Sequence, residues 1–199
     1  MKAVIFIDVQ KDFIDGALRN ERAIEVTPNI VEFAKNINTK MEAGVGSFYT
    51  FYATRDTHKK TEYNCPCSSG IPEPREGYFS TLEGKKLPVE HCIEGTDGWM
   101  IDNRLMEVLD GKCTFVNKPT FGSFDLAEII AEDFENNDLS EIVICGFVTD
   151  ICVVSNALLL RAKFPNTKIT VMKDLCAGTT DERHEAALKV MQSCQIEVV

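Results

Sequence analysis

Short apolar runs alternate with amphipathic stretches along most of the chain. A short apolar run is typical of a buried strand, whereas apolar residues three to four positions apart are typical of one helix face. We expect strands at residues 2–7, 45–52, 113–116, 142–145, 168–172 and 196–199. We expect a helix that begins at Pro28 and ends at Gly44, followed by helices at residues 99–109, 124–134, 151–164 and 181–193.

Strands that alternate with helices pair in parallel, because each helix returns the chain to the same edge of the sheet. The pattern therefore predicts an α/β fold, a three-layer α/β/α sandwich with a mainly parallel sheet of about six strands. We expect residues 1–199 to form a single domain, because the sequence shows no repeat and no linker. Residues 59–96 are polar, rich in Gly and Pro and without periodicity, so we expect an irregular loop segment there.

The composition excludes several classes of partner. A net charge of −10 disfavours binding to nucleic acid or to an anionic membrane surface. No apolar run approaches the roughly 20 residues of a membrane span, and Asp8 interrupts the apolar start of the chain, which favours a first strand over a signal peptide. Several of the eight cysteines fall inside expected strands and helices, so we expect a reduced, cytoplasmic protein.

Cys65 and Cys67 stand apart from this pattern, because one residue separates them within the irregular segment. This spacing is closer than the usual zinc-binding spacing of two to four residues. We interpret them as exposed loop thiols or as residues with an accessory structural role.

The carboxyl ends of the expected strands gather residues that suit catalysis. Ligand sites of open α/β sheets lie at this edge. Asp8 follows the first strand, Lys118 follows the third, and the fourth leads to Cys152, the second residue of an expected helix. A helix N-terminus lowers a thiol pKa, and a carboxylate can take the thiol proton before attack on a carbonyl carbon. The alternative for Cys152 is a small buried hydrophobe.

Five sequence motifs carry a resemblance to a known family. They are residues 8–13 (DVQKDF), 56–58 (DTH), 91–96 (HCIEGT), Lys118 and 146–153 (GFVTDICV). The chain resembles the isochorismatase-like cysteine hydrolases over nearly its whole length, and within them it is most similar to nicotinamidases. The resemblance implies that Cys152 is the nucleophile, Asp8 the general base and Lys118 the third member of the triad. It also implies a cis peptide before Val148, with the N–H groups of Val148 and Cys152 forming an oxyanion hole.

The resemblance also implies a metal site. Asp56 and His58 are two residues apart, so on an extended strand end both side chains point the same way. Together with His91 they match the nicotinamidase metal ligands and suit one divalent ion, Zn²⁺, with Mn²⁺ or Fe²⁺ as alternatives. The alternative is that both histidines are unrelated loop residues. We interpret His184, in the last expected helix, as a solvated residue.

The substrate implied by the resemblance is nicotinamide, hydrolysed to nicotinate and ammonia through a thioester in NAD salvage and pyridine nucleotide biosynthesis. Phe13, Gln10 and Leu87 are the implied substrate-binding residues. Leu87 stands where nicotinamidases commonly carry a Trp, and Trp99 lies eight residues beyond His91. The pocket wall therefore differs from the family pattern. Relatives often form oligomers, so we expect a homo-oligomer.

Three other functions stay open. The first is hydrolysis of another small amide, such as a carbamoyl or ureido compound, by the same fold. The second is isochorismatase activity, which cleaves a vinyl ether without the cysteine and which the presence of Cys152 disfavours. The third is a catalytically silent binding protein, which the complete set of Asp8, Lys118 and Cys152 disfavours.

Overall fold

The computed structural model describes residues 1–44, 48–63, 73–135 and 138–199. Its main sheet has six strands in the order β5-β2-β1-β6-β7-β8, and all of its strand pairs are parallel. The strands are β1 (Lys2–Ile7), β2 (Tyr49–Asp56), β5 (Cys113–Lys118), β6 (Glu141–Phe147), β7 (Lys168–Ala177) and β8 (Glu197–Val198). The predicted fold class, an α/β sandwich around a parallel sheet, is confirmed.

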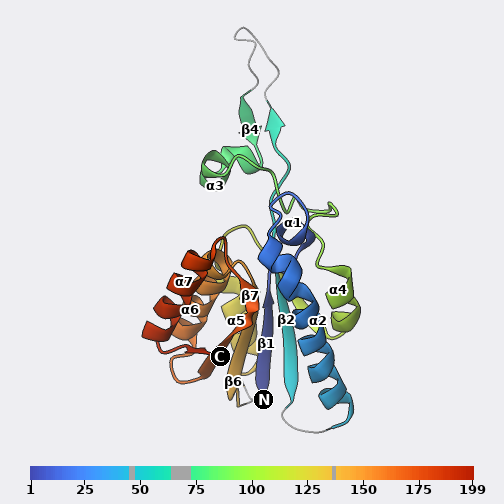
Figure 1. Ribbon diagram of the computed structural model, residues 1–199, viewed down its shortest axis with the longest axis vertical. Coiled ribbons are helices and arrows are strands. Elements are labelled where there is room, and N and C mark those ends of the chain that lie inside the picture. Colours follow the sequence, from blue (N-terminus) through green and yellow to red (C-terminus); the bar gives the residue numbers. More distant parts are fainter. Residues whose placement is uncertain (45–47, 64–72, 136–137) are drawn as a thin grey trace.

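Helices cover both faces of the sheet (Figure 1). One face carries α2 (Glu21–Glu42) and α4 (Asn103–Leu109), and the other carries α5 (Phe124–Asp133), α6 (Val154–Lys163) and α7 (Asp181–Ser193). The central strand β1 is buried on both sides, with residues 3–7 fully inaccessible to solvent. A continuous apolar run of this kind is what a parallel strand between two helical layers requires. No described helix has the length and apolar character needed to cross a bilayer.

The first long helix begins earlier than the sequence predicts. Helix α2 begins at Glu21 and not at Pro28, which lies inside the helix. Asn20 is the N-cap, and its side-chain oxygen accepts a hydrogen bond from the N–H of Ala23 at 3.1 Å. Burial of Ala23 and Val26 in the core stabilises the additional turns. A proline in a helix interior is unfavourable by itself, so tertiary packing decides this boundary.

Several strands extend further toward their carboxyl ends than the apolar runs indicate. Strand β2 continues to Asp56 and β5 to Lys118, and these two residues are register partners. Strand β6 continues through Gly146, which we expected to end it. Gly146 has φ +122°, and a Cβ atom there would lie 2.1 Å from the carbonyl oxygen of Ile7. Only glycine therefore allows β6 to run this close to β1.

The helix expected at residues 99–109 is shorter in the structure. Helix α4 begins at Asn103, with Asp102 as its N-cap. Ile101 forms an isolated antiparallel bridge with Gln10, which holds this part of the chain extended. The strands expected at 168–172 and 196–199 become β7, which continues to Ala177, and the two-residue β8.

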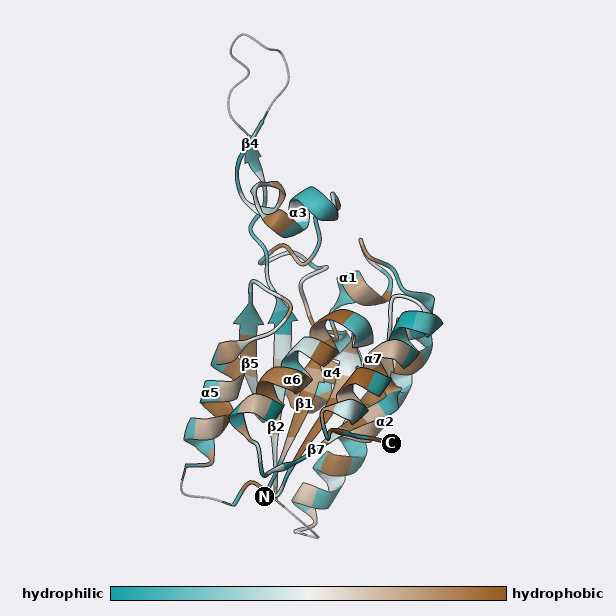
Figure 2. Cartoon of the chain, turned by 90° about the vertical axis from the view of Figure 1, so that its left-hand side faces the viewer, coloured by the Kyte–Doolittle hydropathy of each residue, from teal (hydrophilic) through white to brown (hydrophobic). Residues whose placement is uncertain are grey.

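The segment expected to be irregular contains short regular elements. They are β3 (Glu62–Tyr63) and β4 (Pro74–Glu76), which pair antiparallel, a 3₁₀ turn (Tyr78–Ser80), and α3 (Leu82–Lys86). We call the described residues 59–63 and 73–87 the arm, because its strand pair projects away from the sheet (Figure 1). The arm strand β4 is hydrophilic, whereas the central strand β1 is hydrophobic (Figure 2). Cys65 and Cys67 lie outside the described residues, and the assignment of residues 1–199 to one domain stays a prediction.

Candidate active site

The carboxyl edge of the sheet brings Asp8, Lys118 and Cys152 together. The Nζ atom of Lys118 lies 2.6 Å from Oδ2 of Asp8 and 3.5 Å from Sγ of Cys152. All three residues are buried, with at most 3% of their surface exposed. An ammonium group between a carboxylate and a thiol is an arrangement that suits nucleophilic catalysis.

Thr54 on β2 holds the carboxylate of Asp8 in place. The Thr54 hydroxyl donates to Oδ1 of Asp8 at 2.6 Å, and it accepts the N–H of Asp8 at 3.1 Å. Asp8 itself has φ +47°, which turns the chain sharply after β1. Sequence reasoning missed Thr54. The available signal is its position two residues before Asp56, because alternate residues of a strand face the same side.

Cys152 lies in a π-helical turn and not in an α-helix. The turn comprises Thr149–Val153 and connects β6 to α6, and we call it the Cys152 turn. The carbonyl oxygen of Val148 accepts hydrogen bonds from the N–H groups of Ile151 and Val153, both at 3.1 Å. The peptide bond between Phe147 and Val148 is cis, as the family resemblance implies.

Burial decides the direction of the pKa shifts of Cys152 and Asp8, whereas neighbouring charges decide that of Lys118. It raises the pKa of the Cys152 thiol well above its ordinary value, although the Lys118 charge opposes this effect. The lower thiol pKa expected from a helix N-terminus is therefore not found. Burial also raises the pKa of Asp8, again against Lys118. For Lys118, burial alone would lower the pKa, but Asp8 and Cys152 outweigh it and raise the value, so this residue stays cationic.

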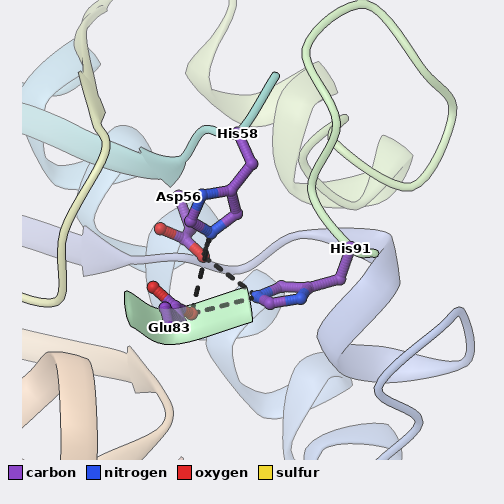
Figure 3. Close-up of side chains that lie close together, drawn as sticks. All are labelled: Asp56, His58, Glu83 and His91. Carbon is purple, nitrogen blue, oxygen red and sulfur yellow. Dashed lines mark hydrogen bonds and ion pairs between the residues drawn. The ribbon is translucent and has the colours of Figure 1, made fainter. Parts of the chain in front are cut away.

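A second cluster of polar side chains lies beside the first. Its donor atoms all lie within 4.8 Å of one another and belong to Asp56, His58, Glu83 and His91 (Figure 3). The Nε2 atoms of His58 and His91 are 3.0 and 3.4 Å from Oδ2 of Asp56, and 3.7 and 3.5 Å from Oε1 of Glu83. The structure thus brings the three expected residues together and adds Glu83 from α3, which sequence reasoning missed.

These four residues fit a divalent metal ion. Two carboxylates and two imidazoles are donors that Zn²⁺, Mn²⁺ and Fe²⁺ accept. Oδ1 of Asp56 is buried without a hydrogen-bond partner among the described residues, although Lys118 Nζ lies 3.5 Å away. Nδ1 of His91 lies 2.9 Å from the carbonyl oxygen of Val89, which leaves Nε2 to face the cluster.

The charges of the cluster explain its ionisation. Burial alone would lower the pKa of His91, but hydrogen bonds to Asp56 and Glu83 raise it to about 9. Burial alone would raise the pKa of Asp56, but hydrogen bonds from His58 and His91 hold it well below its usual value. The carboxylates therefore attract positive charge into this buried space.

Backbone pairing brings His91 to His58. The N–H of His58 donates to the carbonyl oxygen of Cys92 at 3.0 Å, and His58 forms a parallel bridge with Ile93. Oδ2 of Asp12 accepts the N–H of Cys92 at 2.6 Å, which fixes the same loop to α1 (Lys11–Ile14). The HCIEGT motif therefore lies at the cluster because its backbone pairs with the residues that follow β2.

The three residues expected to bind substrate lie in different environments. The buried ring of Phe13 is 5.7 Å from the ring of His91. The side-chain amide of Gln10 accepts the N–H of Asp56 at 2.7 Å and donates to its carbonyl oxygen at 2.9 Å, so it holds the backbone of a candidate metal ligand. Leu87 is 38% exposed, and its carbonyl oxygen accepts the hydroxyl of Tyr78 at 2.8 Å.

Tyr78 is a further residue that sequence reasoning missed. Its ring is fully buried, with its centroid 4.9 Å from the His58 ring and 5.0 Å from the His91 ring. It borders a cavity of about 340 Å³ that His58, Lys118 and Pro119 also line. The arm thus supplies an aromatic wall next to Asp56, His58, Glu83 and His91, which we call the metal cluster because their donor atoms suit a metal ion. Trp99 instead donates to the hydroxyl of Thr57 at 2.9 Å.

The sequence of residues 2–199 matches the family model described as the isochorismatase domain. The chain belongs to the isochorismatase family. A nicotinamidase of Schizosaccharomyces pombe is 28% identical to it over 99% of this chain and 92% of that protein. A nicotinamidase/pyrazinamidase of Mycobacterium tuberculosis is 24% identical over 100% of this chain and 98% of that protein.

Solved structures of other proteins share the fold. A nicotinamidase from Bacillus subtilis superimposes with a TM-score of 0.74 at 23% identity, covering 100% of this chain and 98% of the other. A pyrazinamidase of Pyrococcus horikoshii in complex with zinc gives a TM-score of 0.72, also at 23% identity and with the same coverage. Both similarities extend over the whole sheet and its two helical layers.

Proposed function

We propose that this isochorismatase-family protein is a cysteine-dependent amidohydrolase that converts nicotinamide to nicotinate and ammonia. The observation that carries the proposal is the position of Lys118, whose Nζ lies 2.6 Å from Asp8 and 3.5 Å from Cys152. The neighbouring four-donor cluster and the 28% identity to a nicotinamidase of S. pombe support the choice of substrate.

The triad supplies the acid–base chemistry. Asp8 takes the proton of Cys152 Sγ as the sulfur attacks the carboxamide carbon, so the raised thiol pKa is overcome only during the reaction. The N–H groups of Val148 and Cys152 hold the oxyanion. Asp8 then returns the proton to the amide nitrogen, and the C–N bond breaks. Ammonia departs, and the acyl group remains on Cys152 as a thioester. A water molecule that transfers a proton to Asp8 attacks this thioester and releases nicotinate and the thiol.

The charge of Lys118 allows these reaction steps to occur in a buried site. The one negative charge, on Asp8 before the proton transfer and on the Cys152 thiolate after it, would be costly to bury without a nearby cation. Lys118 remains protonated because these same groups raise its pKa. Its positive charge favours whichever of the two groups is ionised, and thus the transfer of the proton between them.

We infer that Asp56, His58 and His91, with Glu83 as a fourth donor, hold one divalent metal ion, and that this ion is Zn²⁺, with Mn²⁺ or Fe²⁺ as alternatives. When bound, such an ion supplies a Lewis acid that a pyridine nitrogen can coordinate. Phe13 packs against His91 and offers an apolar surface for the ring. Gln10 holds Asp56, and Tyr78 packs on both histidines, so these residues orient the ligand set.

The same function places the protein in NAD salvage and pyridine nucleotide biosynthesis. We also propose that the protein is cytoplasmic and forms a homo-oligomer, in which residues 1–199 of each subunit form a single domain. Size-exclusion chromatography with light scattering measures the mass of the assembly. Elution as a monomer of 22.3 kDa would contradict the oligomer.

The decisive experiment is ammonia release from nicotinamide by purified protein loaded with Zn²⁺, with and without a chelator. We expect release that the chelator suppresses, and no release by the Cys152→Ala variant, which should keep the fold and the metal. Turnover by Cys152→Ala would remove the nucleophile assignment. Release that persists after measured loss of the metal would show that the metal cluster is dispensable.

Leu87 stands where a Trp was expected, and Tyr78 adds an aromatic wall from the arm. This altered pocket favours a second candidate substrate class, small amides other than nicotinamide that are hydrolysed by the same chemistry. A panel of pyrazinamide, carbamoyl and ureido compounds tests it. Faster release from one of these than from nicotinamide would assign the protein to that substrate.

A further inference from the structure

His184 contacts the Cys152 turn through Thr149. It lies on α7, and its Nδ1 atom is 2.8 Å from the hydroxyl oxygen of Thr149, the first residue of the turn. Thr149 is fully buried, whereas His184 is half-buried. The solvated helix position expected for His184 is therefore not what the structure shows.

The approach of α7 to the turn depends on the residues before it. A Cβ atom at Gly178 would lie 2.7 Å from Cβ of His184, so glycine allows this close packing. Thr179 donates from its N–H at 2.7 Å and from its hydroxyl at 2.6 Å to the carboxylate of Asp150. Two successive residues of the turn, Thr149 and Asp150, are thus held by α7 and the loop that precedes it.

Thr149 lies between the two proposed oxyanion donors. Val148 precedes it directly, and Cys152 follows within the same turn. Donors that stabilise an oxyanion must be held in a fixed geometry, because a displacement of about 1 Å is enough to lose much of their effect. A hydrogen bond that fixes Thr149 therefore also fixes the direction of both N–H groups.

We propose that His184 is a positioning residue for catalysis, which acts through Thr149 on the oxyanion donors of the Cys152 turn. This inference rests on the proposed cysteine-hydrolase function. The side chain of His184 hydrogen-bonds to Thr149, and no hydrogen bond or ion pair joins it to Cys152 or to the metal cluster among the described residues. Its loss therefore lowers kcat and leaves KM and metal content unchanged. The role is distinct from that of Asp8 and Lys118, which exchange or stabilise charge.

A cavity open to solvent lies beside His184 and allows a rescue experiment. His184 borders a solvent-open cavity of about 340 Å³, which Gly178, Asp181, Glu185 and Leu188 also line. Removal of the imidazole ring enlarges this cavity toward Thr149. Free imidazole added to the solution can therefore reach the vacated position.

The first test compares His184→Ala with His184→Asn, whose amide can replace Nδ1 as a partner of the Thr149 hydroxyl. We expect His184→Ala to lower kcat about tenfold, the usual effect of one hydrogen bond, with KM within about twofold. His184→Asn should retain most of the activity, and imidazole should restore part of it to His184→Ala. Glu185→Gln, which borders the same cavity, is the matched control and should match the unmodified protein.

A double-mutant cycle then tests the route through Thr149. Thr149→Val should lower kcat about tenfold, and Thr149→Val combined with His184→Ala should lower it by about the same factor. A drop of about a hundredfold in the double variant would mean that the two residues act independently, which would overturn the inference. Unchanged kcat in His184→Ala would overturn it as well. If His184→Ala fails to fold, His184→Leu, which fills the space but cannot hydrogen-bond, replaces it in the cycle, and a kcat equal to that of the unmodified protein would again overturn the inference.

Hydrolysis of an activated ester such as p-nitrophenyl acetate separates this inference from the proposed function. This reaction needs the thiol and the oxyanion donors but no nicotinamide pocket. If the unmodified protein hydrolyses neither the ester nor nicotinamide, the proposed function fails and this inference fails with it. If it hydrolyses either and His184→Ala is equally fast, only the inference about His184 is wrong.

Discussion

Lys118 connects the two clusters of the candidate site at the level of single residues. Its Nζ lies 2.6 Å from the Asp8 carboxylate and 3.5 Å from Oδ1 of Asp56, so one buried cation serves the triad and the metal cluster. A buried charge that loses its partner is costly, because no water replaces the lost interaction. The contribution of Lys118 to stability and its contribution to catalysis are therefore coupled.

The variant Lys118→Met tests this coupling. We expect it to abolish amide hydrolysis and to lower the free energy of unfolding by about 3–5 kcal/mol, because Asp8 is left buried and unpaired. Chemical denaturation and steady-state kinetics measure the two effects. Adding Asp8→Asn to Lys118→Met should restore much of the stability and none of the activity. A double variant as unstable as the sum of its single changes would contradict the pairing.

Glu83 is the second residue whose role can be tested directly. We expect Glu83→Gln to weaken Zn²⁺ binding about 10–100-fold, because a neutral amide is a poorer ligand than a carboxylate. Competition with a zinc-sensitive dye measures the affinity. Glu94→Gln, an exposed position on the neighbouring cavity, is the control and should bind Zn²⁺ like the unmodified protein. Equal affinity in both variants would remove Glu83 from the ligand set.

Part of the candidate site could be predicted from the sequence, because several of its residues lie at strand ends. Asp8, Lys118 and Asp56 follow or end apolar runs, and parallel strands deliver their carboxyl ends to one edge. Glu83 and Tyr78 could not be predicted in this way, because the segment that carries them shows no hydrophobic periodicity. Their positions depend on tertiary contacts of the arm with His58 and His91.

At the scale of elements, the amino ends of the central strands share an ion-pair cluster around Glu141. Its carboxylate lies 2.6 Å from Lys2 Nζ and 3.4 Å from Lys168 Nζ, and it accepts the hydroxyl of Thr170 at 2.8 Å. Burial alone would raise the pKa of Glu141, but Lys2 and Thr170 outweigh it and lower the value. This cluster joins β1, β6 and β7 at the end of the sheet opposite to the active site.

The lowered pKa of Glu141 gives a pH-dependent prediction. A carboxyl group whose pKa is lower in the folded protein contributes stability above its unfolded value, here 4.5, and loses it as the pH falls through the folded value. We expect Glu141→Gln to lower the free energy of unfolding by about 1 kcal/mol at pH 7, after allowance for solvent screening, and by less as the pH falls below about 4. Urea denaturation at several pH values measures both.

The exposed pair of Glu128 and Lys163 supplies the control for this measurement. Glu128→Gln should change the free energy of unfolding by less than about 0.5 kcal/mol, because surface ion pairs contribute little. Equal losses for both variants would show that the environment of Glu141 has no special effect.

Element boundaries show where local patterns stop being sufficient. Apolar runs located every strand of the main sheet, yet β2 and β5 continue into polar residues because each still pairs with its neighbour. Pro28 indicated a helix start, but core contacts of Ala23 and Val26 extend α2 beyond it. Residues 151–153 of the Cys152 turn were expected to be α-helical, since sequence periodicity does not distinguish a π-helical turn.

At the scale of the whole molecule, the metal cluster joins parts of the chain that are distant in sequence. Asp56 ends β2, Glu83 belongs to the arm, and His91 belongs to the loop held by α1. An ion that binds only the folded arrangement stabilises it by about 2.7 kcal/mol at a hundredfold excess over its Kd. We expect chelation to lower Tm by about 5–10 °C.

Differential scanning calorimetry with and without Zn²⁺ measures this shift. Cys152→Ala, which leaves the cluster intact, should show the full shift, whereas Asp56→Ala should show none. A Tm independent of Zn²⁺ in the unmodified protein would contradict a metal site that spans these elements.

The projecting arm has a consequence for how specificity can change in this family. The proposed catalytic residues Asp8, Lys118 and Cys152 belong to the sheet and the turn after it, whereas Tyr78 and Glu83 belong to a segment attached only between β2 and α4. An exchange of arms between relatives would replace the pocket wall and leave these three catalytic residues unchanged. The scaffold is thus modular, and grafted arms offer protein engineers a route to new amide selectivities without redesign of the nucleophile.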